Sequence, residues 1–302
     1  MPIILVNKRN SKNRKIVVMH IDEDLKQYQA ILLSGCAVLG AAHLGFLLTL
    51  EAERKLRFLK VVTGASIGSI VGLFYLAAIP LDAVAAIFRD HTLLSMLTLL
   101  DDMQEMYQQQ GLFNPTKIIA VCKDICRRHG VEPDTLTFKA LRQTGRPVDL
   151  VIVASRYDTL NHTFSPDYFS IETSPDMLVF DAIRLSISIP LVFAVPTYLD
   201  AYYVDGVLTD ELPFAYIEQK YAIKTDDMLA HAPYSDNHTS SSMYTHLVKH
   251  CLTQVRKPTA PHRVLHTKLI LPHIASELTT TPELIDYFII SGIITTRTFL
   301  SS

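Results

Sequence analysis

The segment Gly64-Ala65-Ser66-Ile67-Gly68 joins a stretch typical of a buried strand, 58–63, to an apolar stretch typical of a helix, 69–76. A G-x-S-x-G sequence at a strand-to-helix turn indicates a nucleophile elbow, because glycines beside the serine permit a tight turn and a positive φ. The elbow presents the serine hydroxyl at the end of a sheet, and the helix N-terminus behind it favours developing negative charge. The alternative is a turn of small residues that only lets a helix pack close to a strand.

Strand and helix patterns alternate along the rest of the chain. This alternation favours an α/β fold with a mostly parallel sheet. The predicted strands are 30–34, 148–155 and a pair within 192–204, and the predicted helices are 41–55, 81–89, 115–128, 137–143, 174–188 and 283–299, the last broken near Gly292.

Composition excludes several classes of protein. The chain has 302 residues, 49% of them hydrophobic, so it has ample material for a core. A formal net charge of −2 gives no basic footprint, and we expect no nucleic-acid partner. Four cysteines do not make a disulfide framework, and their number suits a reducing compartment. The two that lie one helical turn apart, Cys122 and Cys126, are expected in the core. Because the N-terminal region also lacks the apolar segment of a signal peptide, we expect a cytoplasmic protein.

Two stretches, 30–50 and 61–81, contain no Asp, Glu, Lys or Arg and are long enough to span a membrane. Each has a pair of glycines where a loop would fall, so two buried strand–helix units are favoured over two membrane spans. Apolar residues between 91 and 112 fit either a lid or docking helix or the core, and helical spacing favours the core. These residues are Leu93, Leu94, Met96, Leu97, Leu99 and Leu100.

A second candidate chemical group lies in Tyr203-Val204-Asp205-Gly206-Val207. A nucleophilic serine needs a base, and an aspartate at the end of a strand lies where sites in open α/β sheets gather. The alternative is an ordinary Asp-Gly turn.

Seven of the twelve histidines fall within 231–273. The pairs His246/His250 and His262/His266 have the spacing of zinc ligands on one helix face, but no third ligand is identified. A histidine-rich solvated surface is therefore favoured over a zinc site.

Four blocks together resemble the patatin-like phospholipases, in the order and spacing of that family. The resemblance covers about residues 28–215. The blocks are the glycine-containing loop and helix start 33–45, the elbow 64–68, the serine-rich block 186–193 and the aspartate block 203–213.

The resemblance implies a three-layer α/β/α fold and a lipid acyl hydrolase, of phospholipase A type or a lipase. It makes Ser66 the nucleophile and Asp205 the base of a dyad that forms an acyl-enzyme, without a catalytic histidine, cofactor or metal. Backbone N–H groups of Gly35, Cys36 and Ala37 would bind the oxyanion, and Gly206 follows the base.

The implied partners are a phospholipid or another acyl lipid and, transiently, a membrane surface. His43, where the family often has histidine, is interpreted as packing or support for the loop. The expected organisation is an N-terminal extension (1–27), a catalytic domain (28–215) and a C-terminal part packed on the same domain (216–302), with a mobile loop at 235–242.

The chain departs from the family pattern in the loop. The family usually has three consecutive glycines followed, two positions later, by Arg or Lys, whereas this chain has Gly35-Cys36-Ala37 and Leu39. If Cys36 or Ala37 needs a φ above zero, that conformation costs about 1–2 kcal/mol. Leu39 also removes the positive charge that would favour the oxyanion. Val207 also stands where Gly or Ala is usual. The departures support the alternative of a catalytically impaired relative that binds lipid or a protein partner.

Overall fold

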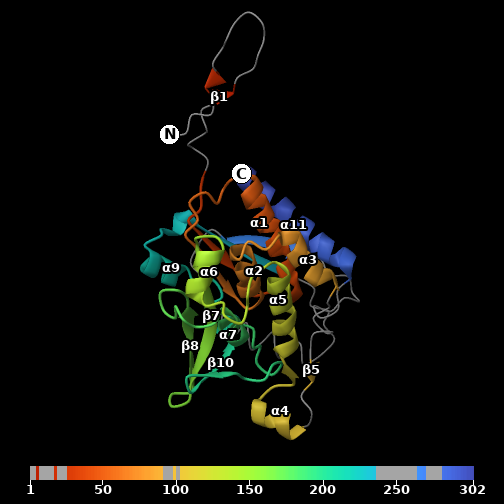
Figure 1. Ribbon diagram of the computed structural model, residues 1–302, viewed down its shortest axis with the longest axis vertical. Helices are drawn as coiled ribbons and strands as arrows, with labels where there is room; N and C mark the ends of the chain where they lie inside the picture. Colours follow the sequence, from red (N-terminus) through yellow and green to blue (C-terminus); the bar gives the residue numbers. More distant parts are fainter. Residues whose placement is uncertain are drawn as a thin grey trace, which may run out of the picture.

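The computed structural model describes residues 5–6, 17–18, 26–90, 98–99, 103–235, 264–269 and 281–302. Its main sheet is built from the strands β3 (Ala30–Leu33), β4 (Val61–Ala65), β7 (Asp149–Asp158), β8 (Thr163–Phe169), β9 (Thr197–Tyr198), β10 (Ala201–Asp205), β11 (Met228–Ser235) and β12 (Val264–Leu269). The strand order is β12-β11-β3-β4-β7-β10-β9, and β8 also pairs with β7 (Figure 1).

The five strands from β12 to β7 are parallel to one another. Strands β8 and β10 run antiparallel to β7, and β9 forms a hairpin with β10. The predicted mostly parallel sheet is confirmed. Two short antiparallel pairs are separate from this sheet: β1 (Leu5–Val6) with β2 (Val17–Val18), and β5 (Thr98–Leu99) with β6 (Phe113–Asn114).

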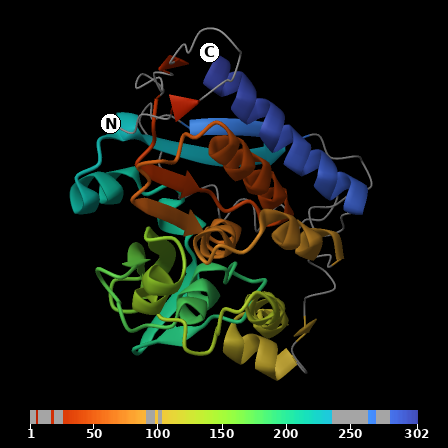
Figure 2. The same ribbon diagram turned by 45° about the horizontal axis from the view of Figure 1, so that its top comes forward.

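Helices cover both faces of the sheet, which gives three layers. On β3, Ile31 and Leu33 belong to one core while Ala30 and Leu32 belong to the other, as the alternation of side chains along a strand requires. The first, larger core packs under α1 (Ala41–Ala52), α2 (Ile67–Leu76), α3 (Leu81–Asp90), α5 (Thr116–Arg128), α6 (Phe138–Thr144), α7 (Val179–Ser186) and α11 (Pro282–Ser301). The second packs under α9 (Phe214–Tyr221), which lies across the molecule from α11 in both views (Figures 1 and 2).

The remaining described elements are short. They are the 3₁₀ turns η1 (Ala37–Gly40) and η3 (Thr225–Asp227) and the helices α4 (Met103–Gln109) and α8 (Val207–Asp210).

Helix α11 runs continuously beside α1 (Figure 2), so the predicted break at Gly292 is wrong. A Cβ on Gly292 would lie 2.2 Å from the carbonyl oxygen of Ala42, and one on Gly45 would lie 2.0 Å from that of Ile289. The two glycines therefore let the helix backbones touch, which outweighs the helix-breaking tendency of Gly292. By length and composition α11 is apolar enough to cross a bilayer, but its inner face packs on α1.

Other boundaries also differ from the prediction. The strand expected from residue 58 begins at Val61, because the turn after α1 continues through Phe58, which is 54% exposed. The helix expected from Ser174 begins at Val179, because Leu178 is still extended and forms a bridge with Thr137. Neither apolar stretch is a continuous helix, since each contains a strand, a turn and a helix. Cys122 is buried, as expected, and so is Cys126.

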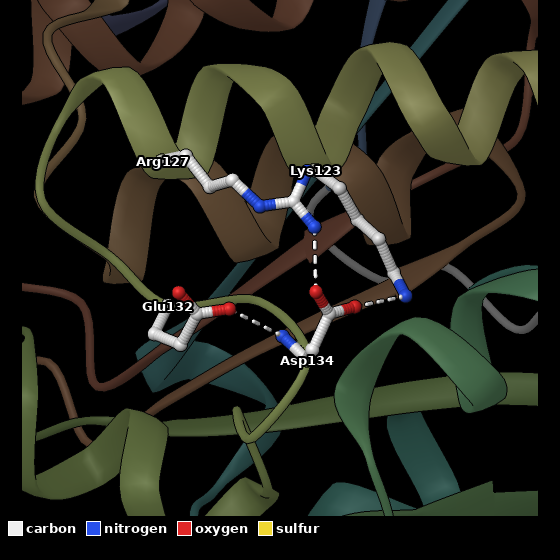
Figure 3. A network of polar contacts seen from close by, with 4 residues as sticks. All are labelled: Lys123, Arg127, Glu132 and Asp134. Carbon is white, nitrogen blue, oxygen red and sulfur yellow. Dashed lines mark hydrogen bonds and ion pairs between the residues drawn. The ribbon is translucent and has the colours of Figure 1, made fainter.

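The end of α5 is tied to the segment that follows it by a small polar network (Figure 3). The Asp134 carboxylate accepts hydrogen bonds from Lys123 at 2.7 Å and from Arg127 at 2.5 Å, and its own N–H donates to Glu132 at 3.3 Å. These groups are solvent-exposed, so the network stabilises the fold only modestly. The same helix carries Ile118 and Cys122 to the site described next.

Several predictions concern residues outside the described ones. The loop at 235–242 lies there except for Ser235, and so do Cys251 and the pair His246/His250. The apolar residues between 93 and 100 lie there as well, apart from the backbone of Leu99 in β5.

Candidate active site

Ser66 lies at the turn between β4 and α2 with φ 53° and ψ −127°. This sparsely populated conformation with positive φ costs an L-residue about 1–3 kcal/mol and is the strain expected of a nucleophile elbow. The side chain is 8% exposed and stands at the N-terminus of α2. The Ser69 hydroxyl donates to the Ser66 carbonyl at 2.6 Å and closes the first turn of the helix.

The two glycines of the elbow, Gly64 and Gly68, allow neighbouring backbone segments to lie in direct contact. A Cβ on Gly64 would lie 2.3 Å from the carbonyl carbon of Gly68, and one on Gly68 would lie 2.2 Å from the oxygen of Leu33. No side chain fits at either position. The positive φ that the motif requires is found at Ser66 itself and not at these glycines.

Asp205 ends β10 and is 1% exposed. Oδ1 of its carboxylate accepts a hydrogen bond from the Val207 N–H at 2.9 Å, and the Ser66 hydroxyl lies close enough to the same carboxylate to lower its pKa. Burial, and to a smaller extent the charge of Glu211, raises the pKa of Asp205 to about 7 against the opposing effects of Ser66 and the Val207 N–H. The structure thus brings Ser66 and Asp205 together, with the carboxyl group titrating near neutral pH.

Serines from three other positions hold the elbow and the aspartate block in register. The Ser66 N–H donates to the Ser186 hydroxyl at 2.9 Å, and that hydroxyl donates to the Val153 carbonyl at 2.6 Å. The Asp205 N–H donates to the Ser188 carbonyl, and the Asp205 carbonyl accepts from the Ser155 hydroxyl, both at 2.8 Å.

The resemblance to the family assigns no role to the residues of the serine-rich block 186–193. The spacing of this block in the sequence does not show that the Ser186 hydroxyl accepts a hydrogen bond from the backbone N–H of Ser66. Gly206 packs equally closely, because a Cβ there would lie 2.1 Å from the Val153 carbonyl.

The loop after β3 lies directly against the candidate nucleophile. A Cβ on Gly35 would lie 2.8 Å from the Ser66 Cβ and 2.2 Å from Cγ2 of Val207. Gly35 is therefore required because any side chain at this position would clash with Ser66 and Val207. Val207, which departs from the family pattern, narrows that space further.

Backbone strain in this loop is confined to one of the two replaced glycines. Ala37 has φ 48°, which favours glycine, whereas Cys36 has φ −154°, which any residue adopts. The expected cost therefore falls on Ala37 alone. Leu39 is buried at 4% exposure, so an apolar side chain occupies the position where the family usually has a cation.

Ser66 opens into an apolar pocket. Its walls come from the loop after β3, from α2, α3 and α5, and from the segment that follows α7. Among the described lining residues only Ser66 and Cys122 bring side-chain heteroatoms to the pocket, which suits a hydrocarbon chain. The lining residues are Ala37, Val38, Ser66, Ile67, Ile70, Phe74, Ile87, Phe88, Ile118, Cys122, Ile187, Ile189 and Phe193.

The two buried histidines of the described residues, His43 and His231, form hydrogen bonds with groups other than Ser66 and Asp205. Both ring nitrogens of His43 are engaged, by the Ser34 carbonyl at 3.0 Å and by His231 at 2.8 Å. His231 is fully buried, so the prediction of a solvated surface is wrong for this residue, because β11 lies inside the sheet between β3 and β12. Among the described residues no three potential ligands lie close enough for a metal, and His262 lies outside them.

A family model described as patatin-like phospholipase matches residues 31–217, which is more than half of the chain. The chain therefore belongs to the patatin-like phospholipase family. A curated relative, "Probable lipid hydrolase 463L" of Invertebrate iridescent virus 6, is 26% identical over 216 residues, which cover 68% of this chain and 70% of the relative.

Solved structures share the fold. VipD from Legionella pneumophila superposes with a TM-score of 0.57 at 13% identity, covering 91% of this chain and 67% of that one. The type III effector ExoU gives a TM-score of 0.51 at 15% identity, and this chain spans 53% of its length. The predicted family and fold class are confirmed.

Proposed function

We propose that the protein hydrolyses acyl ester bonds of lipids through a Ser66–Asp205 dyad. The observation that carries the proposal is a buried carboxylate beside a strained elbow serine at an apolar pocket. Family membership supports lipid hydrolysis in general, and the geometry of the dyad supports the particular mechanism.

In the first half-reaction the Ser66 oxygen attacks the ester carbonyl while Asp205 takes the hydroxyl proton. A base with a pKa of about 7 is half ionised near neutral pH and is basic enough to share that proton in the transition state. The oxyanion would be stabilised by backbone N–H groups of Gly35, Cys36 and Ala37 and by the N-terminus of α2. When the tetrahedral intermediate collapses, the alcohol leaves with the proton from Asp205, and the acyl group stays on Ser66.

In the second half-reaction Asp205 takes a proton from water, which attacks the acyl-enzyme. The fatty acid leaves, and the proton returns to the Ser66 oxygen. The apolar pocket holds the acyl chain in both steps, since its lining matches a hydrocarbon.

Covalent labelling with a fluorophosphonate, followed by peptide mass spectrometry, tests the nucleophile and the oxyanion site together. We expect labelling at Ser66, and losses of at least about 1,000-fold in esterase activity for Ser66→Ala and about 100-fold or more for Asp205→Asn. Ser165→Ala, in β8 and outside the pocket lining, is the matched control and should retain activity. Wild-type turnover no higher than that of Ser66→Ala would refute the proposal.

A second candidate function, lipid binding without turnover, is favoured by the strain at Ala37 and by the buried Leu39. In that case a fluorophosphonate would not label Ser66, while a fluorescent fatty acid would still bind. Restoring the family residues in the double variant Ala37→Gly, Leu39→Arg would then be needed to obtain turnover.

A lipid substrate implies transient contact with a membrane surface, and we propose a cytoplasmic protein that binds membranes peripherally. On α4, Met103 and Tyr107 are 84% and 86% exposed and lie one helical turn apart. Sedimentation with phosphatidylcholine vesicles should bring down the wild type and less of a Met103→Ser, Tyr107→Ser variant. Cell fractionation that finds the protein only inside a membrane-bounded compartment would contradict the localisation.

A further inference from the structure

A chain of hydrogen bonds through two buried histidines lies behind the loop after β3. His43, on α1, contacts the Ser34 carbonyl through Nε2 at 3.0 Å and His231 through Nδ1 at 2.8 Å. His231, on β11, contacts the Thr267 hydroxyl of β12 through Nε2 at 2.8 Å. All three side chains are fully buried.

The direction of every hydrogen bond in this chain follows from its first acceptor. The carbonyl oxygen of Ser34 only accepts, so His43 Nε2 carries a proton and donates it. Burial lowers the pKa of His43 to about 4 and holds that of His231 well below its usual range, so both rings are neutral at pH 7. His43 Nδ1 therefore accepts from His231 Nδ1–H, and His231 Nε2 accepts from the Thr267 hydroxyl.

His231 thus holds both the N–H and the carbonyl of Ser34, the first directly and the second through His43. The Ser34 N–H donates to the His231 carbonyl at 3.2 Å, and the Ser34 carbonyl is held by His43, which His231 orients. The next residue, Gly35, packs on Ser66, and Ala37 lines the pocket. The hydrogen-bonded chain therefore ends one residue before the loop that faces the candidate nucleophile.

This support matters more here than in a loop of three glycines. Ala37 occupies a left-handed conformation that costs about 1–2 kcal/mol. This strain favours backbone conformations of the loop other than the one that faces Ser66. The Cys36 sulfur lies 3.5 Å from His43 Nε2 and adds a contact to the same ring. A displacement of about 1 Å in a catalytic loop can cost about 100-fold in rate.

We propose that His43, His231 and Thr267 are positioning residues that orient the Gly35–Ala37 backbone for the oxyanion, a role that rests on the function proposed above. None of them touches the reacting atoms, and their effect passes through the Ser34 peptide. A purely structural role would lower stability without separating kcat from KM and without depending on where a replacement places its hydrogen-bond donor.

Two replacements of His231 separate these roles. Asparagine places an amide N–H where Nδ1 stands and can still donate to His43, whereas glutamine places its amide where Nε2 stands and cannot. Both lose the stacking of the imidazole on Phe46, at 4.5 Å between ring centroids, so the loss of packing is common to the pair.

We expect His231→Gln to lower kcat for a soluble p-nitrophenyl ester by about 10–100-fold with little change in KM, and His231→Asn to retain most of the activity. A trifluoromethyl ketone, which forms an oxyanion on Ser66, should lose affinity for the Gln variant in parallel with kcat. Thr267→Val should show a smaller loss that Thr267→Ser does not. Melting temperatures of the Asn and Gln variants should agree closely.

Imidazole nitrogen NMR of the wild type tests the proton placement without a variant. His43 should be the Nε2–H tautomer and His231 the Nδ1–H tautomer. The opposite tautomers, or equal kcat values for the Asn and Gln variants of an active enzyme, would overturn the proposal. Absence of wild-type turnover would instead refute the hydrolase function itself, and the two failures are thereby distinguished.

Discussion

Replacing Asp205 by asparagine should lower catalysis by about 100-fold or more and yet stabilise the fold at alkaline pH. The buried carboxyl group titrates at about 7 in the folded protein against an ordinary value of 3.8. Because the folded-state pKa is the higher one, the folded protein binds more protons between about pH 4 and pH 7. The free energy of unfolding therefore falls as pH rises through this window, and above it the whole cost of the buried charge is present.

The size of the effect follows from the two pKa values. At about 1.4 kcal/mol per pKa unit, ionising Asp205 costs about 4 kcal/mol at pH 8 but only about 1 kcal/mol at pH 4.5. Asparagine is neutral at both pH values and can still accept the hydrogen bond from the Val207 N–H. We therefore expect Asp205→Asn to be more stable than the wild type by up to about 4 kcal/mol at pH 8 and by about 1 kcal/mol at pH 4.5.

Urea unfolding followed by circular dichroism at the two pH values measures this difference. Ser66→Ala is the control for loss of activity, and Asp226→Asn, at an exposed carboxylate, is the control for the charge change. A stability gain for Asp205→Asn that is the same at both pH values, or a loss at pH 8, would show that Asp205 is not a buried base with a raised pKa.

Three further predictions concern the base, the loop and the C-terminal helix. The value of kcat/KM should fall about tenfold per pH unit below about pH 7, as Asp205 becomes protonated, and a flat profile from pH 5 to 8 would contradict this. Ala37→Gly should raise stability by about 0.5–1 kcal/mol in urea unfolding, and Ala222→Gly, at another left-handed position (φ 51°), should give a similar gain without changing activity. Gly292→Ala should cost about 1–3 kcal/mol, because its Cβ would lie 2.2 Å from the Ala42 carbonyl, and an unchanged melting curve would refute that contact.

The parts of the fold that could be predicted are those that a short stretch of sequence determines by itself. The elbow at Ser66 and the strand that ends at Asp205 combine hydrophobic runs with glycines at fixed positions, and the structure places both where these patterns indicate. The break predicted at Gly292 is wrong because a glycine that weakens an isolated helix is also the residue that lets two helices touch. Only the tertiary contact distinguishes these two roles.

The support of the site could not be predicted in the same way. His231 belongs to a stretch rich in histidine, and nothing in its neighbours shows that β11 pairs with β3 beside the loop. Its contact with His43 joins residues 188 positions apart. Such pairings depend on strand order, which no local spacing encodes. At Cys36 the sequence predicts backbone strain that the structure does not contain. A cysteine replaces a glycine there, but its φ of −154° is one that any residue adopts.

The hydrogen bond between the Ser66 N–H and the Ser186 hydroxyl has a consequence for the order of folding. It joins residues 120 positions apart, and the same segment holds the Asp205 backbone through Ser188. Closing so long a loop is entropically costly, so these contacts form only after the strands between them have assembled. During synthesis a nascent chain that has not yet reached Asp205 carries an elbow without its base. Under the proposed function, hydrolytic activity would thus appear only after residue 205 has been made and the strands that join the elbow to the aspartate block have paired.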